Sequence, residues 1–218
     1  MGIIATAAEH FKEGGFWMWP ILFTSLIGLA LSAERFIYIR RASAVRKEEF
    51  LKTLNQLILK GDLERCISYC AQTQTPLTRI TRAGLMAIAS RKSTDEVQTA
   101  MDAVALREIP RIEQRTSLIA MLSNLATLWG LLGTTIGMIG AFGAVSKVAP
   151  SEKATMLAAS ISEAMNCTAF GLLTAIPLLA IYGWLQSRGQ ELVDDVHEAA
   201  VATLNFILSN RDKFQQMR

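Results

Sequence analysis

The sequence predicts an all-α integral membrane protein with three transmembrane helices, two of them extended into a helical cytoplasmic domain. The chain is 51% hydrophobic and only 19% charged, and its mean hydropathy is positive, a balance typical of membrane proteins. Long apolar segments cover residues 16–39, 118–145 and 156–185. Each segment exceeds the roughly 20 residues that a helix needs to cross the hydrocarbon core of a bilayer.

The N-terminal part of the chain predicts an outer segment followed by a membrane anchor. Residues 1–15 are expected to form an amphipathic helix outside the membrane, and residues 16–39 the first transmembrane helix. The transmembrane segment stays apolar until Glu34 and then runs into the basic sequence ERFIYIRR. Because it lacks a small-residue cleavage site before Glu34, we interpret it as an anchor rather than a signal peptide.

Residues 40–117 predict a domain built from short helices. Apolar residues recur at helical spacing in the sequence EEFLKTLNQLILKG, which stops at Gly61, and a second helix is expected from Asp62. Residues 72–76 break the helical pattern, and residues 77–90 resume it. The loop between the first two transmembrane segments is therefore itself folded.

The second and third transmembrane segments predict long helices that leave the membrane. A capping box starts a helix near Thr94, and its pattern continues through residues 118–145 with Pro110 as the breaker. We expect one helix of about 50 residues, kinked at the proline, which lacks a backbone N–H. Residues 146–155 form a short loop, after which residues 156–185 continue into a C-terminal helix over residues 186–218.

The distribution of cations predicts the orientation in the membrane. Residues 40–117 hold 14 Lys and Arg and the tail after Gln186 holds four, whereas residues 1–15 hold one and residues 146–155 hold two. By the positive-inside rule, residues 40–117 and the tail are cytoplasmic, and the N-terminus and the short loop are periplasmic.

Several function classes find no support in the composition. The net charge of +3 follows from this inward bias and implies no nucleic-acid partner. Cys66 and Cys70 have no second cysteine pair or nearby histidine to complete a zinc site, so we interpret them as buried structural residues. His10 and His197 are far apart, and no nucleophile and base occur together. We therefore expect no enzyme activity, no cofactor and no bound metal.

Glycines mark the second transmembrane segment as a packing surface. Its sequence LWGLLGTTIGMIGAFGAV places a glycine every three or four residues around Thr134 and Thr135. In lipid, small residues let helix backbones approach closely. The residues that we expect to pack helices together are Gly130, Gly133, Gly137 and Gly140, with Gly171 on the third segment.

The third transmembrane segment carries polar residues that are costly in lipid. Glu163 lies about two turns inside the outer boundary, with Asn166 on the same side, and an intramembrane carboxylate costs several kcal/mol unless it is paired or hydrated. Thr168 lies roughly 16 Å along the helix, near mid-membrane, and Thr134 reaches a similar depth. We interpret Thr134, Thr168, Glu163 and Asn166 as a candidate ion path. Ordinary packing, with hydroxyls bonded to their own helix and Glu163 at the rim, is the alternative.

These segments also resemble a known family. The sequence LGTTIGMIGAF at residues 132–142, the sequence SEAMNCTAFGLLTAIPLLAIY at residues 162–182 and the AERFIYIRR end of the first span are similar to the MotA/TolQ/ExbB proton-channel family, above all to ExbB and TolQ. The resemblance covers nearly the whole chain. Asn166 and Cys167 depart from the apolar or small residues of the family pattern.

The resemblance implies a partner and an assembly. The chain would form a homopentamer in the bacterial inner membrane around two copies of a single-span ExbD/TolR-like protein, whose aspartate carries the proton. Thr134 and Thr168 would face that aspartate, and Glu163 would shape the subunit contacts and the ion path. Ion flow would then drive work on outer-membrane transport or envelope processes, through a periplasm-spanning protein of the TonB/TolA kind.

Two alternatives remain open from the sequence. The chain could be the stator of another envelope or motility machine, or a non-conducting oligomeric membrane scaffold. A neighbouring gene for a short protein with one aspartate-containing span would favour the ion-driven motor over the scaffold.

Overall fold

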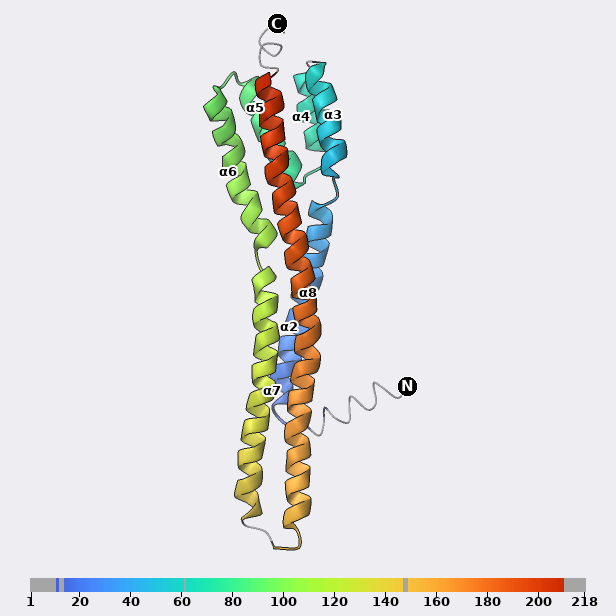
Figure 1. Cartoon of the computed structure of the whole chain (residues 1–218), viewed down its shortest axis with the longest axis vertical. Helices are drawn as coiled ribbons and strands as arrows, with labels where there is room; N and C mark the ends of the chain where they lie inside the picture. Colours follow the sequence, from blue (N-terminus) through green and yellow to red (C-terminus); the bar gives the residue numbers. More distant parts are fainter. Residues whose placement is uncertain (1–10, 12–13, 61, 147–148, 210–218) are drawn as a thin grey trace. The chain divides into compact units, whose positions relative to one another are not determined.

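The computed structural model describes residue 11 and residues 14–60, 62–146 and 149–209, and the secondary structure in this part of the chain is helical (Figure 1). Three of the described helical stretches are long and apolar enough to cross a membrane. The prediction of an all-α membrane protein with three such helices is confirmed. The amphipathic helix expected over residues 1–15 lies mostly outside the described residues.

The chain divides into two compact units. The first, which we call the apolar unit, comprises Met1–Glu34 and Arg115–Trp184. The second, which we call the charged unit, comprises Arg35–Gln114 and Leu185–Arg218. Both units are assembled from segments that are distant in the sequence.

Three helices build the apolar unit: most of α2 (Met18–Ala42), all of α7 (Thr116–Val145) and the first part of α8 (Lys153–Ser209). Here α7 and α8 run side by side (Figure 1). The buried Ser123 hydroxyl on α7 donates a hydrogen bond of 2.7 Å to the carbonyl of Ala175 on α8. Gly28 on α2 faces the side chain of Leu178 on α8. The pair of helices α7 and α8 is therefore joined by a polar contact inside an apolar unit.

Four further helices, the end of α2 from Arg35 and the last part of α8 build the charged unit. The helices are α3 (Lys47–Leu59), α4 (Leu63–Gln72), α5 (Pro76–Ala89) and α6 (Thr94–Glu113). As the sequence predicted, a helix begins near Asp62, and the structure shows that the Asp62 carboxylate caps α4 by accepting from the Arg65 N–H at 3.1 Å. The capping box at Ser93 and Glu96 is also present.

The core of the charged unit is made of large apolar side chains. Phe50, Leu54 and Ile58 repeat along one face of α3, and each is at most 1% exposed. They pack in one cluster with Leu85 of α5 and Val196 of α8. Burial of side chains of this size stabilises a fold by about 1.5–3 kcal/mol each. Cys66 and Cys70 belong to the same cluster, so their predicted structural role agrees with their burial.

The single helix of about 50 residues expected from Thr94 is interrupted, and the interruption lies at Gln114 and Arg115 rather than at Pro110. The helix α6 passes through Pro110 and ends at Glu113. The next residues break the helix, since Gln114 is extended and Arg115 has a left-handed φ of 66°.

A buried arginine explains where α6 ends. Arg35 is 3% exposed, and its Nη2 atom donates to the carbonyl of Arg111 at 3.1 Å and to the carbonyl of Ile112. In a continuous helix these two carbonyls would accept the N–H groups of residues 115 and 116. The guanidinium therefore replaces two of the backbone donors that are missing at the end of α6.

Candidate functional site

Glycines bring the backbones of α7 and α8 into contact. A Cβ atom placed on Gly130 would lie 3.0 Å from the carbonyl oxygen of Cys167 and 3.2 Å from the Cα of Thr168. A Cβ on Gly171 would lie 2.8 Å from the carbonyl oxygen of Ala126. Neither position has room for a side chain, so this is a close helix contact of the kind that small residues permit in lipid.

The two predicted path threonines meet at this contact. The Thr168 hydroxyl donates to the Gly130 carbonyl at 3.1 Å and lies 3.4 Å from the Thr134 hydroxyl. Thr134 in turn donates to the Leu131 carbonyl at 2.7 Å. Both side chains are half-buried. Since a hydroxyl can donate once and accept twice, each oxygen keeps acceptor capacity for a further group.

Thr135 is a neighbouring hydroxyl with a different environment. It is exposed, and it donates to the same Leu131 carbonyl at 2.9 Å. Its bond is the ordinary one of a threonine to its own helix. Thr134 therefore differs from Thr135 in lying beside Thr168 and not in its local helix bond.

Glu163 lies one helix turn before Cys167 and faces a separate cavity. This cavity of about 290 Å³ is lined by residues of the segment before α2, of α7 and of α8, among them Gly137, Ser160, Glu163 and Cys167. Glu163 is exposed in the single chain. The structure thus joins Thr134 to Thr168 and places Glu163 at the neighbouring cavity. Asn166 is half-buried on α8 between the two places.

Only some of the glycines of α7 lie in close contact with α8. A Cβ on Gly133 would meet the Cys167 side chain at 2.9 Å, and a Cβ on Gly137 would meet that of Ala164 at 3.1 Å. At Gly140 and Gly143 a Cβ would meet no atom within 4 Å. Within this chain, α7 is therefore closely packed at Gly133 and Gly137 but has space beside Gly140 and Gly143.

Sequence reasoning missed three contributors to the apolar unit. Ser123 forms its hydrogen bond from inside an apolar run, and only its polarity there signals a role. Gly14 and Gly15 form a turn against α8, in which the Gly14 carbonyl accepts from the Cys167 thiol at 3.0 Å. A glycine pair directly before a transmembrane segment was the available signal.

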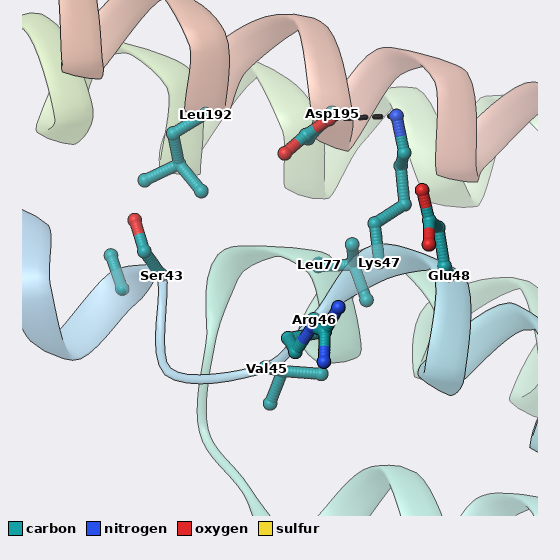
Figure 2. A pocket seen from close by; sticks show the side chains of 9 residues that line it. Ser43, Val45, Arg46, Lys47, Glu48, Leu77, Leu192 and Asp195 are labelled. Atoms are coloured by element: carbon teal, nitrogen blue, oxygen red, sulfur yellow. Dashed lines mark ion pairs between the residues drawn. The ribbon is translucent and has the colours of Figure 1, made fainter.

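The charged unit contains a second cavity, of about 330 Å³. Figure 2 shows Ser43 and Leu192 beside this cavity and Lys47 reaching Asp195 on α8. The Lys47 ammonium lies 2.8 Å from Asp195 and 2.6 Å from Glu198, and hydrogen bonds to these carboxylates raise the pKa of Lys47 above its ordinary value. Because two carboxylates already neutralise this cation, the arrangement serves to tie α3 to α8.

The two cysteines of the charged unit, Cys66 and Cys70, have thiols of low reactivity. Burial raises the pKa of Cys66 to about 11 and the pKa of Cys70 to about 12, so both stay protonated at neutral pH and react slowly. Among the described residues, no group of His, Cys, Asp and Glu could hold a metal ion.

The described part of the chain is helical, with three helices long and apolar enough to cross a membrane, and two hydroxyls lie together where α7 and α8 meet. A model of the MotA/TolQ/ExbB proton channel family matches residues 72–198, more than half of the chain. The protein therefore belongs to this family and is a membrane proton-channel subunit of a motor driven by the proton-motive force, not an enzyme.

Individual relatives agree with the family assignment. The chain is 26% identical over 196 residues to the biopolymer transport protein ExbB homolog of Methanothermobacter thermautotrophicus, a match that covers 90% of this chain and 68% of that one. It is 35% identical over 96 residues to the Tol-Pal system protein TolQ of Haemophilus influenzae, covering 44% and 42%. The biopolymer transport protein exbB1 of Vibrio cholerae is 26% identical over 172 residues, covering 78% and 74%.

A solved structure shares the fold. The structure of C. jejuni MotAB matches with a TM-score of 0.64 at 17% sequence identity, and the match covers 88% of this chain and 78% of that one. At this identity the likeness establishes the fold alone.

Proposed function

We propose that this chain is the ring-forming subunit of an ion-driven motor of the ExbB/TolQ kind. Five copies would surround two copies of a single-span ExbD/TolR-like partner, whose membrane aspartate carries the proton. The observation that carries this proposal is the meeting of the Thr168 and Thr134 hydroxyls, 3.4 Å apart, at the close contact of α7 and α8. The resemblance of the sequence to ExbB and TolQ, and the names of the relatives, support the same reading.

The hydroxyl pair suits the handling of a proton that arrives on another group. The Thr168 proton has two acceptors within reach, the Gly130 carbonyl and the Thr134 oxygen. Its hydroxyl can therefore donate to a carboxylate or accept from a carboxylic acid with little movement. Neither threonine titrates, so the charge must come from a partner. Loss and gain of the partner's proton would then change its contact with the ring and move it.

The cation distribution supports a topology for this motor. Residues 40–117 and the tail after Gln186 hold 18 of the 22 Lys and Arg, a bias that supports a cytoplasmic position for both in a bacterial inner membrane. The N-terminus and the link between α7 and α8 would be periplasmic. Work would then be delivered through a TonB/TolA-like protein to outer-membrane transport or envelope processes.

Counting the subunits tests the assembly. Native mass spectrometry of the detergent-solubilised complex, expressed with its neighbouring genes, should find five copies of this chain with two of a single-span companion. This chain alone, in any number, would instead favour a non-conducting scaffold. A companion of the flagellar kind would favour a stator of a motility machine.

A pair of alanine variants tests the ion path. In proteoliposomes of the assembled complex, we expect Thr168→Ala to lower proton flux by about tenfold, the factor that matches one lost hydrogen bond of about 1.4 kcal/mol. Thr135→Ala is the matched control, because this threonine shares the Leu131 acceptor but is not hydrogen-bonded to Thr168. Equal flux in the wild type, Thr168→Ala and Thr134→Ala would overturn the assignment of the path.

A further inference from the structure

The contact between α7 and α8 has two edges that differ in chemistry. The hydroxyls of Thr134 and Thr168 lie 3.4 Å apart at the first edge. Successive residues of an α-helix are about 100° apart around its axis, which puts Trp129 about 140° from Thr134 on α7. By the same measure Cys167 is about 100° from Thr168 on α8. Because Trp129 and Cys167 pack in one apolar cluster, the second edge of the contact, away from the hydroxyls, is apolar and aromatic.

The chain just before α2 covers this second edge. Trp17 stacks on Trp129 of α7, with ring centroids 6.1 Å apart and planes 28° from parallel. A Cβ atom placed on Gly133 would lie 3.2 Å from the Cβ of Trp17 and 2.9 Å from the Cβ of Cys167. Trp17 and Cys167 therefore meet over this glycine, at the place where α7 and α8 come together.

The segment that carries Trp17 is also attached to α8. The Cys167 thiol, which is 2% exposed, donates to the Gly14 carbonyl at 3.0 Å. Phe11 packs edge-on against Phe170 of α8, with ring centroids 5.8 Å apart. Met18, at the start of α2, is fully buried in the same cluster as Cys167. Contacts with both helices thus fix the position of the tryptophan.

The hydroxyl pair is too weak to set its own geometry. A distance of 3.4 Å is long for an O–H···O bond, which is usually about 2.7–2.8 Å. The Thr168 hydroxyl has a shorter bond to the Gly130 carbonyl. In lipid, helices are joined by close packing, and a pair of aromatic rings adds attraction beyond the area that it buries. The distance between the two hydroxyls therefore depends on the packing at the opposite edge.

We propose that Trp17 is a positioning residue for the candidate ion path. Its ring, stacked on Trp129 and seated over Gly133, holds α7 against α8 so that Thr134 and Thr168 stay paired at the other edge. The space that glycine leaves on α7 is filled from outside the helix pair, and the hydroxyl edge stays open to a partner. The inference rests on the proposed function for the use of the hydroxyl pair, whereas the pairing itself can be measured without ion flow.

Disulfide formation measures the pairing of the two threonine positions. The thiols of a Thr134→Cys/Thr168→Cys variant would replace hydroxyls that lie 3.4 Å apart, so they should oxidise rapidly under a mild oxidant in the assembled complex. Mass spectrometry after alkylation of the remaining thiols counts the oxidised fraction. Slow oxidation with Trp17 intact would show that the two positions are not held together and would overturn the proposal. The native cysteines are replaced in this background by Cys66→Ala, Cys70→Ala and Cys167→Ser, since serine keeps a donor.

Trp17→Ala in this background tests the positioning role. We expect oxidation about tenfold slower, a factor that corresponds to about 1.4 kcal/mol, and Trp17→Phe, which keeps a ring against Trp129, should restore most of the rate. Trp19→Ala is the matched control, because Trp19 is 54% exposed and packs on Phe11. Equal rates in Trp17→Ala and Trp19→Ala would overturn the positioning role. If Trp17→Ala does not assemble, Trp17→Leu takes its place, since leucine keeps apolar volume without an aromatic face, and the same comparison decides.

Proton flux separates this role from the proposed function. In proteoliposomes of the whole complex with its native cysteines and threonines, flux should fall about tenfold in Trp17→Ala, stay near wild type in Trp19→Ala and recover in Trp17→Phe. Slow oxidation with normal flux in Trp17→Ala would make Trp17 a packing residue only and overturn its role for the ion path. Absence of flux in the wild-type complex would overturn the proposed function, while the oxidation rates would still decide whether Trp17 pairs the two positions.

Discussion

The apolar unit and the charged unit hold their helices together by opposite means. In the apolar unit, α7 and α8 meet through glycines and through hydroxyls bonded to carbonyls of the facing helix, at Gly130, Ser123 and Thr168. In the charged unit, helices meet through large buried side chains such as Phe50 and Leu85. Ion pairs such as Lys47 with Asp195 join them at the surface.

The difference follows from the solvent around each unit. In water, burial of apolar surface drives association, so large side chains between helices are favourable. In lipid this driving force is lost, and helices associate by close packing and by polar contacts. The apolar unit therefore needs polar groups between its helices for stability, and the same groups are available to handle ions. Under the proposed function, the residues of this one contact would serve both packing and ion movement, whereas the core of the charged unit serves packing.

The largest effect is expected for Gly171→Leu. A Cβ at this position would lie 2.8 Å from the Ala126 carbonyl oxygen and 3.1 Å from the Cα of Gly130, and both are backbone atoms that cannot move aside. We expect a loss of more than about 3 kcal/mol, seen as a collapse of the thermal transition in detergent. Gly183→Leu, where a Cβ meets nothing within 4 Å, is the control.

A graded series sharpens this prediction. Gly137→Ala should cost less, since its Cβ would meet only the Ala164 side chain at 3.1 Å, and Gly140→Ala should cost nothing within one chain. Equal transitions in all three glycine variants and the control would contradict the packing argument. A loss at Gly140 confined to the assembled complex would show that this open face packs against another subunit.

Arg35→Met is expected to have the next largest effect. It leaves the buried carbonyl of Ile112 and the partly buried carbonyl of Arg111 without the guanidinium donor, at a cost of about 2–4 kcal/mol for the two acceptors together. Differential scanning fluorimetry of the purified protein measures the shift. Arg115→Met is the control, because its pair with Glu34 is half exposed on both sides and is worth about 1 kcal/mol or less. Equal shifts for the two arginines would refute the role of Arg35 at the end of α6.

The same positions show how far the sequence predicts this molecule. Apolar length and helical spacing predicted the three long helices, and local signals predicted the helix start near Asp62 and the capping box at Ser93, because these patterns depend on neighbouring residues only. The meeting of Thr134 with Thr168 required a comparison of depths along two helices. The similar depth estimated for the two threonines agrees with the 3.4 Å between their hydroxyls. The estimate needs only the regular rise of each helix, and the glycines allow the backbones of α7 and α8 to come close at that depth.

The failures concern contacts between distant segments. Pro110 was the visible breaker, yet α6 ends three residues later, at Glu113, where Arg35, 76 residues away from Arg111, donates to the Arg111 carbonyl. No residue near Gln114 in the sequence indicates that Arg35 contacts the end of this helix. The stacking of Trp17 on Trp129 was missed for the same reason, since a partner on α7 is set by the tertiary structure.

The smallest effect is expected for Lys47→Met in the charged unit. Lys47 is 22% exposed, but its partners Asp195 and Glu198 are 44% and 67% exposed, so solvent screens both pairs and the loss should be about 0.5–1 kcal/mol. Arg46→Met, whose pair with Glu49 is more than two-thirds exposed on both sides, should be neutral.

The pH dependence of this ion pair has a definite sign. Because the pKa of Lys47 is raised in the folded state by Asp195 and Glu198, its contribution is complete below the ordinary lysine pKa of about 10.4 and is lost as the pH rises toward the folded value. Wild type and Lys47→Met should therefore differ by a constant amount from pH 6 to about 9 and converge in alkali. High salt should reduce the stability difference between wild type and Lys47→Met in this pH range. The stability losses in Gly171→Leu and Arg35→Met arise from contacts with backbone atoms and should persist in high salt. The stability loss in Lys47→Met could instead be independent of salt, or as large as the loss in Arg35→Met. Either result would mean that the charged unit depends on ionic contacts as strongly as on its apolar core.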